Sequence, residues 1–217
     1  MKSVRLVCVT RLSPESFRKS LLGRSIQHLT ILHSIFYNNQ DGGPSPSYNQ
    51  FLTEQYRNEY LVFLHDDVFI DDYWIDVRIN EALAVYDVVG LTGLSYTLPI
   101  KDPIWDGTAP WDCGTVAQGT PENNHFWRLR NRSPYRVYAL DGLCIAVNTA
   151  KILDAGIRWD PQFTRDYYDL DFCCQCNEKG LTLGVWPLAL THSGKGSGKG
   201  PQWYQLQEAF KKKWGTR

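Results

Sequence analysis

Apolar and polar positions change their spacing along the chain in a way that predicts alternating strands and helices. The run at 4–9 is rich in β-branched residues, and 60–64 is continuously apolar, as in a strand covered on both faces. Ser13, Pro14 and Glu15 have the order that begins a helix: a capping hydroxyl, a fixed helical φ and a carboxylate at the positive end. Further helices are expected at 47–57, 71–85, 149–155, 168–179 and 202–214, and further strands at 88–91, 135–148 and 181–190, with another apolar run at 28–36.

The order of these elements predicts an α/β fold, a single domain over 1–217 with a mostly parallel central sheet flanked by helices. The segment 99–133 interrupts the alternation, because it is rich in Trp, Asp, Asn, Gly and Pro and has no sustained period. A long irregular segment inside a compact domain is typically a functional loop. We therefore expect this segment to contribute to a binding site.

Charge and composition exclude several classes of protein. The 217 residues contain 23 Lys and Arg against 23 Asp and Glu, and this balance argues against a protein that binds nucleic acid. No apolar stretch approaches the roughly 20 residues that cross a bilayer, so no transmembrane segment is expected. The first residues run into a strand without the pattern of a signal peptide, so a cytoplasmic location with reduced cysteines is expected.

A histidine and two acids follow the strand at 60–64. His65, Asp66 and Asp67 stand beyond its carboxyl end, where ligands bind in open parallel sheets. Two acids beside a histidine suit a divalent cation that also accepts phosphate oxygens. The alternative is that these acids cap the next helix, but Asp71 and Asp72 are expected to supply that cap. The pattern therefore favours a ligand site.

Two later segments offer further candidates. Asp169 and Asp171 lie near the start of a predicted helix and are expected to point to different sides of it. At most one of them is therefore expected to face a cleft as a general base, and the alternative role of such an acid is to stabilise the positive end of the helix. The glycine-rich loop at 192–200 lies between a strand and a helix, where phosphate can bind. It departs from the nucleoside-triphosphatase motif because Gly200 follows Lys199, where Ser or Thr is required. The alternative for this loop is a flexible surface turn.

Two other features are interpreted as structural. Cys173 and Cys176 have no second cysteine pair at zinc-site spacing, so they are expected to be buried thiols. The basic segment 211–214 is interpreted as a solvated, frayed helix end.

Together these segments resemble the GT-A-fold glycosyltransferases, especially family-2-like enzymes and the small glycosyltransferase domain of the streptomycin-biosynthesis type. The matching segments, in order, are 48–50, 60–67, 140–147, 159–160, 168–172, 180 and 192–194. The resemblance implies a GT-A-type, Rossmann-like domain with a nucleotide-binding half near 1–98 and an acceptor and catalytic half near 99–217. It also implies transfer of a sugar from a nucleoside-diphosphate sugar, commonly a UDP-sugar, to a glycan or another hydroxyl acceptor. Inversion at the anomeric carbon is the expected outcome, with retention as the alternative.

The resemblance also implies roles for single residues. Asp67 and His192 match ligands of a divalent metal ion, Mn²⁺ or Mg²⁺, and Asp169 matches the catalytic base, with Asp171 as the second choice. The residues that match nucleotide-sugar contacts are Thr10, Arg11, Asn49, His65, Asp66, Asp141 and Lys195. Trp111 and Trp127 are expected to form an acceptor wall, because Trp rings pack on sugar rings; the alternative is a loop pinned by buried Trp.

Two other functions stay open at this point. A non-catalytic domain of the same fold that binds nucleotide-sugars or carbohydrates is consistent with His65, which stands where the family has an Asp. A nucleotidyltransferase would share the sheet and the acidic metal ligands. That class predicts an N-terminal glycine-rich nucleotide loop, however, and 10–14 has no glycine.

Overall fold

The structure is a computed structural model that describes residues 1–37, 39, 43–95, 112–128, 133–194 and 200–215, with the backbone alone at 112 and 124–128. Its strands are β1 (Ser3–Val9), β2 (Leu32–Phe36), β3 (Glu59–Leu64), β4 (Val68–Ile70), β5 (Val88–Gly90), β6 (Thr92–Leu94), β7 (Asp112–Thr120), β8 (Asn123–Arg128), β9 (Tyr135–Val137), β10 (Ala139–Leu140), β11 (Cys144–Asn148), β12 (Leu183–Val185) and β13 (Leu190–His192). Its helices are α1 (Pro14–Phe17), α2 (Leu21–Ser25), α3 (Ser45–Asn49), α4 (Ile75–Leu83), α5 (Thr149–Asp154), α6 (Tyr168–Glu178) and α7 (Pro201–Trp214), with short 3-10 turns at Ile26–His28 and Glu54–Tyr56.

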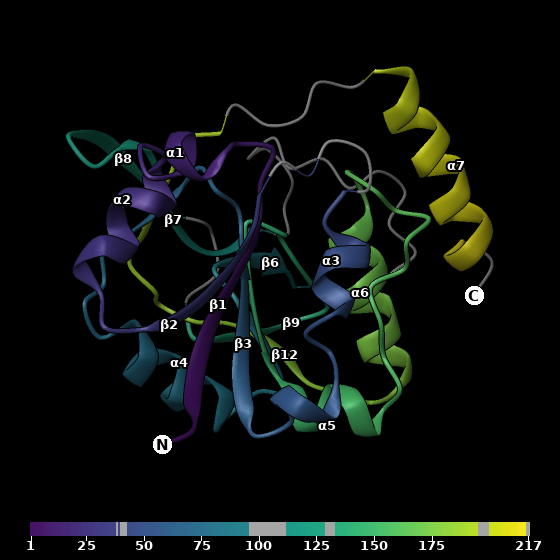
Figure 1. The fold of residues 1–217 in the computed structure, drawn as a ribbon. Helices are drawn as coiled ribbons and strands as arrows, with labels where there is room; N and C mark the ends of the chain where they lie inside the picture. Colours follow the sequence, from purple (N-terminus) through teal and green to yellow (C-terminus); the bar gives the residue numbers. More distant parts are fainter. Residues whose placement is uncertain (38, 40–42, 96–111, 129–132, 195–199, 216–217) are drawn as a thin grey trace.

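The main sheet has seven strands in the order β2-β1-β3-β11-β5-β12-β9 (Figure 1). Neighbours run parallel at β2-β1, β1-β3 and β5-β12, while β11 is antiparallel to β3 and β5, and β9 is antiparallel to β12. The α/β class is confirmed, but the expectation of a mostly parallel sheet is wrong. The chain enters β11 from the edge at which β3 ends, through the short connection 141–143 from β10, so β11 must run in the opposite direction.

Both faces of this sheet are covered by helices, which explains the continuous apolar run in β3. Leu61 and Phe63 pack with residues of α3, α6 and α7 on one face. Val62 and Leu64 pack with residues of α2 and α4 on the other. Successive side chains of a strand point to opposite faces, so a strand buried on both sides has no polar positions.

A second sheet has the order β10-β6-β7-β13-β4, with β8 paired to β7. The β7–β8 hairpin lies in the segment predicted to be irregular, so that prediction is wrong for 112–128. Gly114 and Gly119 interrupt β7 with positive φ angles of 102° and 128°, which hides the strand pattern in the sequence. In this sheet His192, the last residue of β13, pairs in register with Gln118 of β7.

Several helix boundaries differ from those predicted. The helix expected at 71–85 begins at Ile75 and has no side-chain cap, so the capping role of Asp71 and Asp72 is wrong. Asp71 accepts a hydrogen bond from the Thr191 hydroxyl at 2.7 Å, and Asp72 accepts one from the backbone of Trp74 at 2.9 Å. Among the described residues, no helix is both long and apolar enough to span a bilayer.

Candidate active site

The two sheets bring Asp67 and His192, the two predicted metal ligands, together at the carboxyl end of β3. The backbone N–H of His65 donates to Leu143, in the connection that enters β11, at 3.2 Å. The backbone N–H of Ser193, directly after β13, donates to the carbonyl of Asp67 at 3.0 Å. These bonds hold His192 beside the residues that follow β3.

Asp67 lies between two histidines. The Nε2 atom of His192 is 3.6 Å from Asp67 Oδ2, and the Nδ1 atom of His65 is 3.8 Å from Asp67 Oδ1. One potential ligand atom from each of the three residues lies within 4.8 Å of the others. The sequence predicted Asp67 and His192 as metal ligands, and the structure adds His65 to the group.

The outer nitrogens of both histidines have their own hydrogen-bond partners. His65 Nε2 is 2.7 Å from the hydroxyl of Tyr168, and His192 Nδ1 is 3.3 Å from Oε1 of Gln118. Gln118 also donates from Nε2 to the carbonyl of Gly194 at 2.6 Å. Histidines that bind metals commonly use one nitrogen as ligand and fix the ring through the other. Both rings therefore have the orientation expected of ligands.

The space around Asp67 suits a cation. Asp67 Oδ1 is buried and has no hydrogen-bond partner among the described residues. A Cβ at Gly194 would lie 2.4 Å from His192 Nε2 and 2.7 Å from Asp67 Oδ2, so glycine keeps this space open. Two imidazole nitrogens and one carboxylate form a donor set that suits a divalent transition-metal ion better than Mg²⁺, which prefers oxygen.

Burial and neighbouring charges shift the pKa values of all three side chains. Burial acts to raise the pKa of Asp67, but its interactions with His192 and His65 outweigh burial and lower the pKa below its ordinary value. Burial lowers the pKa of His65. For His192 burial acts in the same direction, but the Asp67 carboxylate outweighs it and raises the pKa.

Asp169 lies in the first turn of α6 and is 8% exposed. Its two carboxylate oxygens accept hydrogen bonds from the backbone of Gly142 at 2.9 Å and of Leu170 at 2.8 Å. Burial, and then the nearby charge of Asp141, raise its pKa to about 7. A Cβ at Gly142 would lie 2.1 Å from the Tyr168 hydroxyl, so glycine lets this part of α6 approach closely.

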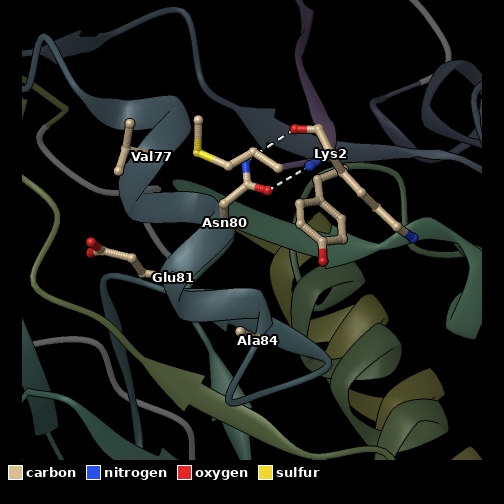
Figure 2. Close-up of a pocket in the computed structure, with 7 residues that line it drawn as sticks. Lys2, Val77, Asn80, Glu81 and Ala84 are labelled. Carbon is tan, nitrogen blue, oxygen red and sulfur yellow. Dashed lines mark hydrogen bonds between the residues drawn. The ribbon is translucent and has the colours of Figure 1, made fainter.

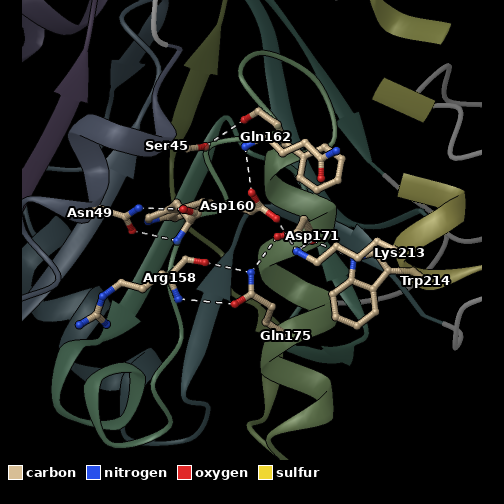
Figure 3. Close-up of polar contacts among 11 residues, drawn as sticks. Ser45, Asn49, Arg158, Asp160, Gln162, Asp171, Gln175, Lys213 and Trp214 are labelled. Atoms are coloured by element: carbon tan, nitrogen blue, oxygen red, sulfur yellow. Dashed lines mark hydrogen bonds and ion pairs between the residues drawn. The ribbon is translucent and has the colours of Figure 1, made fainter. Parts of the chain in front are cut away.

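Asp171 points to the other side of α6, as the sequence predicted, and has structural partners. It is fully buried and accepts hydrogen bonds from Trp214 Nε1 at 2.8 Å and Gln175 Nε2 at 2.7 Å (Figure 3). Lys213 Nζ lies 2.6 Å from the same carboxylate. The interpretation of 211–214 as a frayed end is therefore wrong for Lys213 and Trp214, and the partners of Asp171 favour Asp169 as the residue available for chemistry.

Residues 42–212, most of the chain, match the glycosyltransferase-like family. The chain belongs to this family. It is a glycosyltransferase, as the sequence predicted. A search of curated proteins returned no match.

Among solved structures, the glycosyltransferase is similar to A197 from STIV, with a TM-score of 0.51 and 13% identity, over 91% of this chain and 97% of that one. It is also similar to residues 1–349 of S. aureus TarS, with a TM-score of 0.52 and 14% identity, over 88% of this chain and 60% of that one. Against a longer S. aureus TarS structure the TM-score is 0.53 at 13% identity, and the chain spans 37% of its length. At these identities the likeness concerns the fold, and with the family match it confirms the GT-A-type fold.

Two predicted nucleotide contacts of the glycosyltransferase already have internal partners. The Thr10 hydroxyl, directly after β1, donates to Oδ2 of Asp66 and accepts from the backbone of Leu12 at 3.1 Å. The side-chain amide of Asn49 donates from Nδ2 to the carbonyl of Trp159 at 2.7 Å, and its Oδ1 accepts from the backbone N–H of Trp159 at 2.9 Å. Asn49 thereby fixes the loop before α6, and its role toward a nucleotide stays a prediction.

The other predicted contacts also stay predictions. Arg11 is exposed next to Thr10. Asp141 lies in the connection into β11, where its Oδ1 accepts from the backbone of Leu143 at 3.1 Å. Three predicted residues fall outside what is described, either entirely or in their side chains: Lys195, Trp111 and Trp127.

The sequence did not single out Tyr168, Gln118 or Gly194 as parts of the site. Tyr168 stands next to the predicted base, within the segment 168–172 that carries the family resemblance. Its position in the sequence could therefore have indicated a role in the site. Gln118 lies in the segment predicted to be irregular and gave none. Gly194 lies two residues after His192, within the segment 192–194 that also carries the resemblance, but only the geometry reveals its close approach to His192.

A hollow with a volume of about 700 Å³ lies elsewhere on the enzyme, lined by Met1, Lys2, Tyr60, Val77, Asn80, Glu81 and Ala84 (Figure 2). Asn80 spans it with hydrogen bonds to the backbone of Lys2 at 2.7 and 3.1 Å. Lys2 precedes β1 and Tyr60 is the second residue of β3, so the hollow lies at the amino ends of strands whose carboxyl ends form the site. It is therefore separate from the His65–Asp67–His192 cluster.

Proposed function

We propose that this enzyme transfers a sugar from a nucleoside-diphosphate sugar, most simply a UDP-sugar, to a hydroxyl of a glycan or another acceptor, with inversion. The observation that supports this proposal is the convergence of His65 and His192 on Asp67 at the carboxyl end of β3. Asp169, on α6, supplies a buried carboxylate with a raised pKa near the same edge of the sheet. The family supplies the reaction class.

In this proposal Asp67, His192 and His65 hold a divalent ion, and their two imidazole nitrogens favour Mn²⁺ over Mg²⁺. Such an ion, when bound, would neutralise negative charge on the diphosphate leaving group. Tyr168 and Gln118 keep the two imidazole rings directed toward Asp67.

Asp169 acts as the general base. The acceptor oxygen forms a bond to the anomeric carbon while the bond from that carbon to the diphosphate oxygen breaks, and the hydroxyl proton passes to Asp169. A base with a pKa of about 7 is well matched to neutral pH, since it is both partly ionised and basic enough to accept a proton. Attack from the side opposite the leaving group inverts the anomeric centre.

The remaining assignments complete the substrate sites. Thr10, Arg11, Asp66, Asp141 and Lys195 contact the nucleotide-sugar. Trp111 and Trp127 pack on the acceptor. The six cysteines, which are all described, are buried thiols, and this agrees with a cytoplasmic location.

The proposal is tested by incubating the protein with a panel of nucleoside-diphosphate sugars and acceptors in Mn²⁺, with the released diphosphate measured and the product analysed by NMR. We expect an inverted product from one donor, and loss of transfer in Asp169→Asn with donor binding retained. The matched control is Asp154→Asn, since Asp154 is an exposed acid at the end of α5. If the protein binds a donor but shows no turnover with any acceptor, the result favours the alternative, a non-catalytic domain that binds nucleotide-sugars.

A further inference from the structure

The residue before α6 has an unusual backbone conformation. Tyr167 has φ 67° and ψ −3°, in the left-handed region, and it is the one non-glycine residue with positive φ in the described part of the chain. A bulky residue is strained in this conformation, so the surroundings must enforce it. Tyr167 is followed in the sequence by Tyr168 and Asp169, and the hydroxyl of Tyr168 forms a hydrogen bond with His65. The strained residue therefore sets the direction in which both site residues leave the loop.

Helix α7 supplies the packing that holds Tyr167. The Tyr167 ring lies 5.5 Å from the ring of Trp203 and 5.3 Å from the ring of Phe210, both on α7. Tyr167 and Phe210 are each 4% exposed. Aromatic pairs at these distances add stabilisation beyond the area that they bury.

The last turn of α7 contacts the chain on both sides of Asp169. Lys213 Nζ lies 2.6 Å from Asp160, in the loop before α6, and 2.6 Å from the fully buried Asp171, two residues after Asp169. Trp214 donates to Asp171 as well. A buried carboxylate is stable only with such partners. Separation of α7 from α6 would therefore leave the charge of Asp171 unpaired or expose it to solvent. Figure 3 shows Asp160, Asp171, Lys213 and Trp214 gathered at this junction.

We propose that α7 positions the catalytic turn of α6, with Lys213 and Asp171 as positioning residues that hold Asp169 against Gly142. This inference rests on the proposed function of Asp169. The aromatic contacts fix the residue before the turn, and the Lys213 pairs fix the loop and helix around it. The same helix also follows His192, the last residue of β13, as the next helix in the sequence.

The test compares Lys213→Ala with Lys211→Ala, because Lys211 lies on the same helix turn and pairs only with the exposed Glu208 in the described structure. We expect Lys213→Ala to lower kcat about tenfold and to leave the KM for the donor within about twofold, because misplacing a reacting group by a fraction of an ångström weakens chemistry more than remote binding. Lys213→Arg should restore kcat. Lys211→Ala should match the wild type.

A second measurement does not depend on activity. Amide hydrogen exchange at Gly142 and Leu170, which donate to Asp169, should become about tenfold faster in Lys213→Ala relative to core amides of β3. Should Lys213→Ala fail to fold, Asp171→Asn is measured in the same way. Unchanged exchange at both amides in the folded variant would overturn the positioning role. If the wild type shows no transferase activity and exchange is still faster in Lys213→Ala, the result supports the positioning role and rejects the proposed function.

Discussion

A methyl group at position 194 is expected to destroy cation binding while it leaves the fold intact. In Gly194→Ala the new Cβ would lie 2.4 Å from His192 Nε2 and 2.7 Å from Asp67 Oδ2. Ordinary contacts of a Cβ begin near 3.4 Å, so the imidazole nitrogen must move by about 1 Å. The atoms that move are the ends of side chains, so the backbone can stay in place.

The magnitude follows from how strictly metals constrain their ligands. Ligand distances tolerate about 0.2 Å, so a displacement of about 1 Å removes His192 from the coordination sphere. Disturbing the residues that orient a ligand already costs about 10–100-fold in affinity. We therefore expect at least about 100-fold weaker Mn²⁺ binding, equivalent to about 2.7 kcal/mol. The free energy of unfolding of the metal-free protein should change by less than about 1 kcal/mol.

Calorimetric titration with Mn²⁺ measures this effect, and urea unfolding without metal measures the fold. Gly200→Ala is the matched control, because a Cβ at Gly200 would meet none of the described atoms within 4 Å. Wild-type Mn²⁺ affinity in Gly194→Ala would refute the assignment of the space between His192 and Asp67 to a cation. A large loss of stability in the metal-free variant would show that the glycine serves packing instead.

Three further predictions concern single side chains. The folded-state pKa of Asp169 is about 7, well above that of an unfolded carboxyl, so kcat/KM should rise with pH up to about 7. For the same reason the stability of the wild type relative to Asp169→Asn should fall by up to about 4 kcal/mol between pH 4 and pH 7. The same difference in unfolding free energy between the two proteins at both pH values, measured in urea, would contradict the raised pKa. His65→Asp should weaken Mn²⁺ binding relative to Mg²⁺ binding, and an unchanged ratio of the two dissociation constants would exclude His65 as a ligand. Trp159→Ala should cost about 3–5 kcal/mol in urea unfolding, since Trp159 is fully buried and stacks on Phe172 at 4.0 Å; a loss below about 1 kcal/mol would contradict its place in the core.

Local patterns in the sequence were sufficient for the parts of the site that lie at strand ends. The apolar run that became β3 ends at Leu64, and the polar residues after it necessarily emerge at an edge of the sheet. The start of α1 was also predictable, because Ser13 caps it with its own side chain. The opposite directions of Asp169 and Asp171 follow from helix geometry alone. Such features depend on neighbours in sequence.

Features that depend on distant contacts could not be predicted. The direction of β11 is set by the connection from β10, and this turns a mostly parallel expectation into a mixed sheet. Lys213 and Trp214 have the composition of a solvated helix end, but their partner Asp171 lies far away in the sequence. Gln118 reaches His192 only because β7 and β13 pair.

His65 illustrates how structure changes the interpretation of a departure from a family pattern. In the sequence, a histidine in place of an acid is a reason to consider a non-catalytic domain. In the structure the same side chain points Nδ1 toward Asp67 and anchors Nε2 on Tyr168. The substitution is therefore consistent with a changed donor set at a retained site.

The central claim is that Asp67 binds a divalent ion that the nucleotide requires. The most direct measurement is calorimetric binding of UDP and the other nucleoside diphosphates, with and without Mn²⁺, to the wild type and to Asp67→Asn. We predict that one diphosphate binds the wild type only with Mn²⁺, and that Asp67→Asn abolishes this dependence while staying folded. Metal-independent binding of the same strength in both proteins would contradict the claim.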